Sequence, residues 1–135
     1  MGQYWIPVNL DKKEFIDPHK LGCGLKLVEQ LNNHPGTGAA LLILCAAMPE
    51  RRGGGDLEEH QVIGRWAGDR IALIGDYAER GDFKKARGND SPDRIYNLCI
   101  GGAYTDVSEA VAEVIEREFN GQFVGEGWRE FKRNV

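Results

Sequence analysis

Apolar residues gather into short runs along the chain, separated by turn-forming residues. Residues 3–10 mix aromatic and branched side chains, which favours a strand, and Pro7 within them indicates an edge strand or a bulge. Asp17 followed by Pro18 is typical of a helix start. Apolar residues at helical spacing then predict a helix over residues 18–32.

Three later segments have a clear pattern. The run AALLILCAAM at residues 39–48 contains four alanines, which favours a buried helix over a strand, with Thr37 as its cap. Residues 95–100, IYNLCI, indicate a short strand that ends at two glycines. An apolar stripe after residues 105–108, TDVS, predicts a helix that stops at residues 120–121, Asn-Gly.

The stretch GRWAGDRIALIGDY at residues 64–77 predicts a hairpin over residues 62–75. A type II′ turn at the Gly-Asp pair, residues 68–69, pairs apolar positions on one face and buries Trp66 there. The same register places Arg65 and Arg70 on the opposite, solvent-facing side.

The Gly-Asp pair occurs twice, which raises the question of a carboxylate pair. Asp69 and Asp76 are seven residues apart, an odd offset that puts side chains on opposite faces of a continuous strand. We therefore interpret the first Gly-Asp pair as a turn and the second as the end of a strand. Together these patterns predict a single α+β domain over residues 1–135, with a small antiparallel sheet around a central hairpin, packed by two or three helices. Loops are expected near residues 49–60 and 78–93.

Composition limits the classes of function. The net charge is −4, from 17 Lys and Arg against 21 Asp and Glu, which argues against a nucleic-acid backbone as partner. No apolar run has the length of a membrane span, and the start of the chain does not resemble a signal peptide. Three cysteines without zinc-site spacing favour reduced thiols. A cytoplasmic location is the expectation.

Several segments resemble a family of small uncharacterised proteins from bacteria and their phages. They are MGQYW, PHKLGCGLKL, GGGDL, VIGRWAGDRIALIGDY and YTDVS, of which WAGDRI is the most specific. The resemblance implies an intracellular protein, with a phage or mobile element as one origin. It carries over no catalytic residue, because no activity is established for such proteins.

The predicted binding residues cluster around the hairpin: Arg65, Arg70, Asp69, Trp66, Asp76 and Tyr77. The guanidinium groups of the two arginines could hold an anionic ligand or a partner carboxylate. A solvated sheet face is the alternative interpretation. Likewise, Trp66 favours a core position over a stacking platform, while Tyr77 with Tyr4 and Trp5 could line a pocket.

No metal site or cofactor is predicted, because the spacing of the three histidines brings no ligand set together: His19, His34 and His60. Cys23, between two glycines and near His19, is the candidate for a reactive thiol. Cys45 and Cys99 lie in apolar runs, where a thiol is expected to be buried and inert.

The leading hypothesis for function is a non-catalytic intracellular accessory or inhibitor protein that binds a host macromolecule, with a protein partner favoured over a small molecule. Its contacts would be the arginine-bearing face and the glycine-rich loop around residue 53. The alternative is a small enzyme or ligand-binding domain for an anionic small molecule such as a nucleotide, which would use Arg65, Arg70, Asp69 or Asp76 with His60. A homodimer could form through the edge at residues 3–10.

Overall fold

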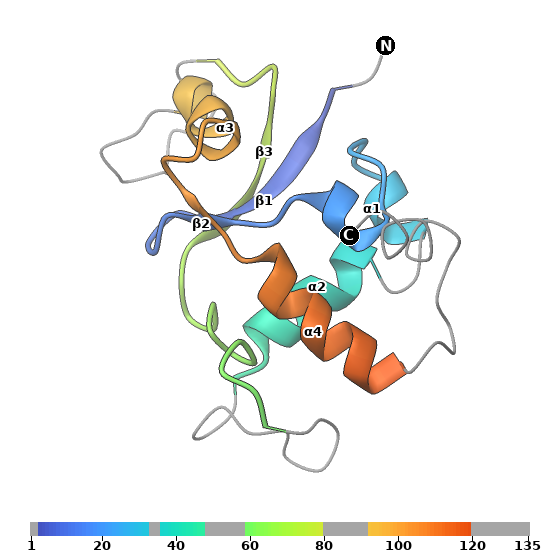
Figure 1. Cartoon of the computed structure of the whole chain (residues 1–135). Coiled ribbons are helices and arrows are strands. Elements are labelled where there is room, and N and C mark those ends of the chain that lie inside the picture. The colour runs from blue at the N-terminus through green and yellow to red at the C-terminus, as the bar shows by residue number, and fades with distance from the viewer. Residues whose placement is uncertain (1–2, 33–35, 48–58, 80–91, 120–135) are drawn as a thin grey trace.

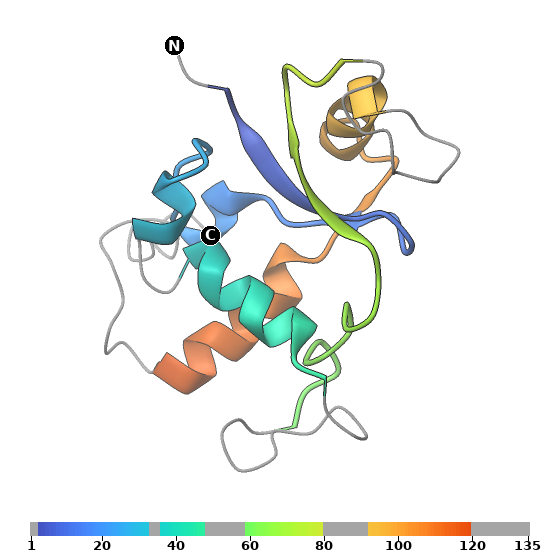
Figure 2. The same cartoon turned by 180° about the vertical axis from the view of Figure 1, so that it is seen from behind.

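The computed structural model describes residues 3–32, 36–47, 59–79 and 92–119, and it has an α+β architecture (Figure 1 and Figure 2). Four strands form one mixed sheet in the order β3-β1-β2-β4. β1 pairs antiparallel with β2 and β3, whereas β2 and β4 run parallel. The α+β class is thus confirmed, although the sheet is mixed. The strands are β1 Trp5–Asn9, β2 Glu14–Phe15, β3 Ile71–Gly75 and β4 Thr105–Asp106.

β1 is an inner strand, so the prediction of an edge or bulged strand at residues 3–10 is wrong. The carbonyl of Pro7 accepts a hydrogen bond from the N–H of Ile16 at 3.0 Å. In an antiparallel ladder the facing residue would return this bond through its own N–H, which proline lacks. Pro7 therefore lies where the β1–β2 ladder ends, and residues 3–10 offer no open edge for a homodimer.

The predicted hairpin over residues 62–75 is also wrong. Residues 61–68 form a series of tight turns, and β3 pairs with β1 over five residue pairs, from Trp5 opposite Gly75 to Asn9 opposite Ile71. The physical reason is that β1 gives β3 a partner of matching length, whereas residues 61–68 have a different role.

That role is to close the C-terminal end of α2 (Gly36–Cys45). The N–H groups of Gly64 and Trp66 donate to the carbonyls of Ile43 and Leu44, at 2.9 and 2.8 Å. These carbonyls belong to the last turn of the helix and need donors from outside it. The expected burial of Trp66 is confirmed, since its side chain is 0% exposed.

The predicted helix over residues 18–32 forms only at its two ends. Asp17 caps a 3₁₀ helix, η1 (Pro18–Leu21), by accepting a hydrogen bond from the N–H of His19 at 3.1 Å. Gly22 then takes a left-handed conformation with φ of 78°, which ends the helix. The chain becomes helical again in α1 (Glu29–Asn32).

The other helices confirm two predictions and correct one. α2 and α4 (Ser108–Phe119) lie where helices are expected. Thr37 lies within the first turn of α2 and does not cap it, and residues 105–106 form β4 ahead of α4. The predicted strand at residues 95–100 is instead part of a helix, α3 (Pro92–Ile100). The glycine-rich loop and the chain after residue 119 lie outside the described residues.

The core consists of two apolar clusters. One packs α3 against the sheet and contains Ile6, Val8, Phe15, Ile74, Ile95, Cys99 and Tyr104. The other joins α2, α4, η1 and the 61–68 turns, and its largest members include Trp66, Ile16, Leu21, Leu44, Ile63 and Ile115. Figure 1 shows α2 and α4 crossing below the sheet, while α3 lies on the other side of β3 from β1 in that view.

Candidate functional site

A polar cluster joins the β1–β2 connection to residues 65–70. It consists of Asn9, Asp11, Lys12, Glu14, Arg65, Trp66, Asp69 and Arg70, and we call it the 9–14/65–70 cluster. Its members lie far apart in the sequence, and the pairing of β1 with β2 and β3 brings them together.

Glu14 is the buried centre of this cluster. Its side chain is 7% exposed and accepts hydrogen bonds from the Arg65 guanidinium, with Nε 3.0 Å from both carboxylate oxygens. Trp66 Nε1 donates to Glu14 Oε1 at 2.9 Å. The charge of this buried carboxylate is therefore balanced, and its oxygens are engaged by fixed donors.

Asn9 organises the neighbouring turn. Its Oδ1 accepts from the backbone N–H groups of Asp11 and Lys12, at 3.0 and 2.8 Å, while its Nδ2 donates to Asp69 Oδ2 at 2.8 Å. The Lys12 ammonium forms an ion pair with the same Asp69 oxygen. The hydrogen bonds from Asn9 and then Lys12 hold the pKa of Asp69 below its ordinary value of 3.8.

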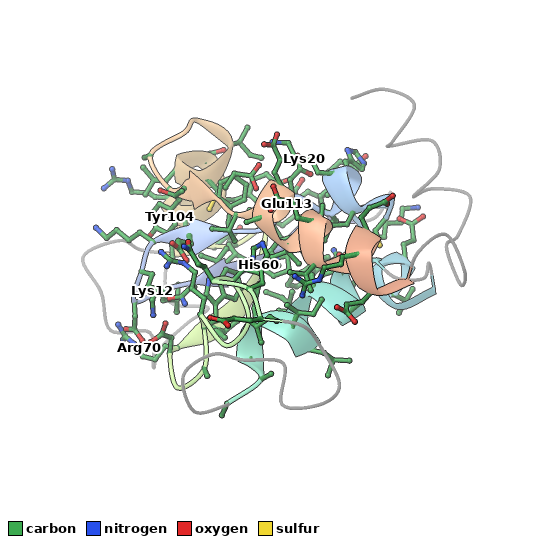
Figure 3. All side chains as sticks on the ribbon, turned by 60° about the horizontal axis from the view of Figure 1, so that its bottom comes forward. Lys12, Lys20, His60, Arg70, Tyr104 and Glu113 are labelled. Atoms are coloured by element: carbon green, nitrogen blue, oxygen red, sulfur yellow. The ribbon has the colours of Figure 1, made fainter. Side chains whose placement is uncertain are left out.

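Arg70 and Asp11 close the exposed side of the cluster. The backbone N–H of Arg70 donates to Asp11 Oδ2 at 2.7 Å, and its Nε donates to Oδ1 at 2.8 Å. These bonds, the backbone one first, lower the pKa of Asp11 below 3.8. Figure 3 shows Arg70 and Lys12 near one another at this side of the molecule.

The chemistry open to the cluster follows from these pairs. The three cations Lys12, Arg65 and Arg70 face the three carboxylates of Asp69, Glu14 and Asp11. The hydrogen bond from Arg65 to Glu14 also raises the pKa of Arg65. Groups whose charges already balance one another leave no uncompensated charge for an anion. The arrangement ties residues 65–70 to the sheet.

The remaining predicted binding residues lie away from this cluster. Asp76 follows the far end of β3, where its Oδ1 accepts from the N–H of Tyr4 at 2.9 Å. Tyr77 comes next and is 57% exposed. The six predicted residues are thus divided between two ends of β3: Arg65, Trp66, Asp69 and Arg70 at its start, and Asp76 and Tyr77 at its end.

The histidine and cysteine candidates are also separated. His60 Nε2 lies 3.1 Å from Glu113 Oε2 on α4 (both residues are labelled in Figure 3), whereas His19 is exposed on η1. The described residues contain no group of three potential metal ligands. Cys23 is buried, and its Sγ accepts from the N–H of Thr37 at 3.4 Å. Cys45, which was expected to be buried, is exposed, whereas Cys99 is buried as expected.

Sequence reasoning missed the half of the cluster contributed by Asn9, Asp11, Lys12 and Glu14. A signal was present, because an asparagine two residues before an aspartate at a strand end is suited to an Asx turn. Nothing in the sequence pattern indicated that Glu14 would pair with residues more than fifty positions away.

Comparison of the chain with known protein families, curated proteins and solved structures finds no match. Among the residues that the structure describes, no helix is long and apolar enough to cross a membrane.

Proposed function

We propose that this chain is a non-catalytic intracellular accessory or inhibitor protein, of bacterial or phage origin, that binds a host protein. The observation that carries the proposal is an exposed aromatic pair at one end of the sheet. Tyr4 lies just before β1 and Tyr77 just after β3, and they are 46% and 57% exposed. Exposed aromatic side chains are the residues most enriched at the centres of protein interfaces.

The surroundings of this pair support a binding surface. The N–H of Trp5 donates to the carbonyl of Leu25 at 2.8 Å, and this bond holds the segment after Leu25 beside the start of β1. That segment contains two further exposed apolar residues, Leu27 and Val28. Exposed apolar side chains that occur together, and not singly, mark sites of contact with a partner.

The state of the 9–14/65–70 cluster supports the same proposal over its rival. A site for a nucleotide or another anion needs cationic or N–H donors that the protein leaves available. Here each arginine is held by a carboxylate of the same chain. An anionic ligand would therefore meet no cation of this cluster whose charge is unbalanced.

The test is a pull-down from a lysate of the source cells with tagged protein. The chain should retain one protein in stoichiometric amount, and Tyr4→Ser or Tyr77→Ser should reduce its recovery at least about fivefold, as loss of an aromatic contact does at an interface centre. Leu42→Ser is the matched control, because Leu42 is an exposed apolar residue on α2, 77% exposed, and should leave recovery unchanged.

Two results would overturn the proposal. One is that no protein is retained in stoichiometric amount, or that the tyrosine variants retain it as well as the control does. The other is a rise in melting temperature with nucleotides, which would favour the small-molecule alternative because a ligand that binds the folded state raises its apparent stability.

A further inference from the structure

β3 is one of the two outer strands of the sheet, and among the described residues no strand pairs with its outer edge. Two backbone hydrogen bonds bound its pairing with β1. The N–H of Leu10 donates to the carbonyl of Arg70 at 2.8 Å, and the N–H of Asp76 donates to the carbonyl of Tyr4 at 2.9 Å. Since the direction of the backbone groups alternates along a strand, the N–H and carbonyl groups of the even-numbered residues of β3 bond to β1. Those of the odd-numbered residues point to the outer edge. The N–H and carbonyl groups of Ile71 and Leu73 have no hydrogen-bond partner among the described residues.

β3 itself contains none of the residues that commonly protect an outer strand. Its sequence, IALIG, contains no charged residue and no proline. Protein sheets commonly use lysine, proline or a bulge to stop such an edge from pairing with another chain. Leu73, at the centre of β3, is 39% exposed.

The charges that flank β3 are symmetric about its centre. Arg70 lies three residues before Leu73, and Asp76 lies three residues after it. If two copies of β3 pair antiparallel about Leu73, Arg70 of each copy lies opposite Asp76 of the other. We infer that the protein forms a two-fold symmetric dimer through β3, held by backbone pairing at residues 71–75 and by two reciprocal Arg70–Asp76 ion pairs.

This register is favoured over its neighbours on two counts. In this register all the residues whose backbone groups point to the outer edge pair with one another, with Leu73 opposite Leu73 and Ile71 opposite Gly75 of the other copy. Shifting one copy by two residues leaves Arg70 opposite Ile74, or Asp76 opposite Ala72, and so removes both charge pairs. A symmetric pairing of this kind closes on itself and gives a dimer, not a fibre.

The two charged side chains are available for this contact. Both are exposed, and Asp76 uses Oδ1 for the Tyr4 N–H, so its Oδ2 has no partner among the described residues. Arg70 is held by Asp11, but a guanidinium group has five N–H donors and can serve two carboxylates. In the proposed register Arg70 and Asp76 occupy a non-hydrogen-bonded pair, in which side chains approach most closely.

In this antiparallel pairing the Tyr4–Tyr77 ends of the two copies lie at opposite ends of the joined sheet, and neither tyrosine is part of the proposed β3 contact. The dimer therefore does not depend on the proposed function. The contact is one short strand from each copy, so we expect a dimer that dissociates on dilution. It should also weaken with salt, because its charge pairs are exposed.

Sedimentation velocity of the full chain over a concentration series tests the inference. The sedimentation coefficient of the wild type should rise from that of a monomer to that of a dimer as the concentration rises. Arg70→Glu places two acidic pairs across the interface and Asp76→Arg places two basic pairs, so each variant alone should be monomeric. An equimolar mixture of the two variants restores both opposite-charge pairs and should again form dimers, each with one copy of each variant.

Lys26→Glu is the control, since it reverses an exposed cation outside β3 and should dimerise like the wild type. Circular dichroism establishes that each variant is folded. A wild type that stays monomeric up to its solubility limit would overturn the inference. So would a dimer that survives in either single variant, or a mixture that fails to associate. Restoration by mixing cannot arise from misfolding, which keeps the test decisive if one variant is destabilised.

Discussion

The carboxylate of Glu14 on β2 accepts a hydrogen bond from the indole nitrogen of Trp66 at 2.9 Å, and both side chains are buried. Trp66 is the largest fully buried side chain among the described residues, and its polar atom needs a partner inside the protein. Glu14 provides that partner while Arg65 balances its charge. This contact joins the sheet to the turns that close α2, so it links the two halves of the fold.

Arg65→Ala should therefore destabilise the protein by about 3 kcal/mol, because removing one partner leaves a buried carboxylate without a counter-charge. Arg70→Ala is the matched control, since its ion pair with Asp11 is exposed and should be worth less than about 1 kcal/mol. Urea unfolding measures both values. Equal losses for the two variants would mean that Glu14 is not held by Arg65 in a low-dielectric site.

A pair of glycines tests the turns that follow α2. Gly64 and Gly68 have φ angles of 75° and 83°, so alanine at either position should cost about 1 kcal/mol or more. A Cβ atom on Gly64 would also lie 2.5 Å from the carbonyl oxygen of Ala46, whereas one on Gly68 would meet nothing within 4 Å. Gly64→Ala should thus lower the melting temperature clearly more than Gly68→Ala. The reverse order would contradict the packing of residues 61–68 against α2.

Acid should destabilise the protein partly through Asp106. Burial acts to raise the pKa of this carboxyl group, but hydrogen bonds from Lys20 and Ser108 outweigh it, so its pKa lies below 3.8. As the pH falls, the unfolded chain binds the proton first, and the free energy of unfolding decreases from about pH 5 downwards. Above that range the stabilisation is fully present.

Asp106→Asn keeps an oxygen that can accept from the Ser108 N–H, but it removes the charge that pairs with Lys20. It should cost about 1 kcal/mol at neutral pH, as a partly exposed ion pair does. It should also make the free energy of unfolding depend less on pH in the acid range, as measured by urea unfolding at several pH values. The same dependence on pH in the variant and the wild type would show that the Lys20–Asp106 pair does not form in solution.

Thiol labelling of the folded protein should begin at Cys45. This residue is exposed, while Cys23 and Cys99 are buried. Burial raises the pKa of Cys99 to about 12, so almost none of it is the reactive thiolate at neutral pH. Cys45 is exposed, but partial desolvation of its thiol also raises its pKa, so its reaction should be slow compared with a free thiol.

We expect Cys45→Ser to remove the first phase of labelling by a chromogenic disulfide reagent, and the other two thiols to react only on unfolding. Fast labelling of Cys23 in the Cys45→Ser variant would instead restore Cys23 as the reactive thiol that the sequence suggested.

Local patterns in the sequence identified the features that depend on neighbouring residues alone. Asp17 and Pro18 start a helix as predicted, because capping and a fixed proline φ act within one turn. The apolar stripe of α4 was equally clear, because its twelve residues span more than three helical turns. The burial of Trp66 was also predicted correctly, although from a hairpin that does not form, because its large apolar side chain favours a core position in either arrangement.

The error at residues 95–100 shows where such reasoning fails. Six residues are too few to distinguish a strand from a helix by their periodicity. The loop predicted near residues 78–93 includes Pro92, but a serine followed by proline is also a typical helix start, and α3 begins at Pro92. Ile95 and Cys99, at i and i+4 of this helix, then face the sheet together.

By itself, then, the sequence determined the α+β class, the helix starts at Asp17 and ahead of α4, and the burial of Trp66, because caps, periodicity and side-chain hydrophobicity act over a few residues. The tertiary structure alone decided that β3 pairs with β1, that Arg65 is held by Glu14, and that, among the described residues, no strand pairs with the outer edge of β3. Contacts between segments more than fifty residues apart depend on which surfaces fit when the whole chain packs, and no local pattern contains that information.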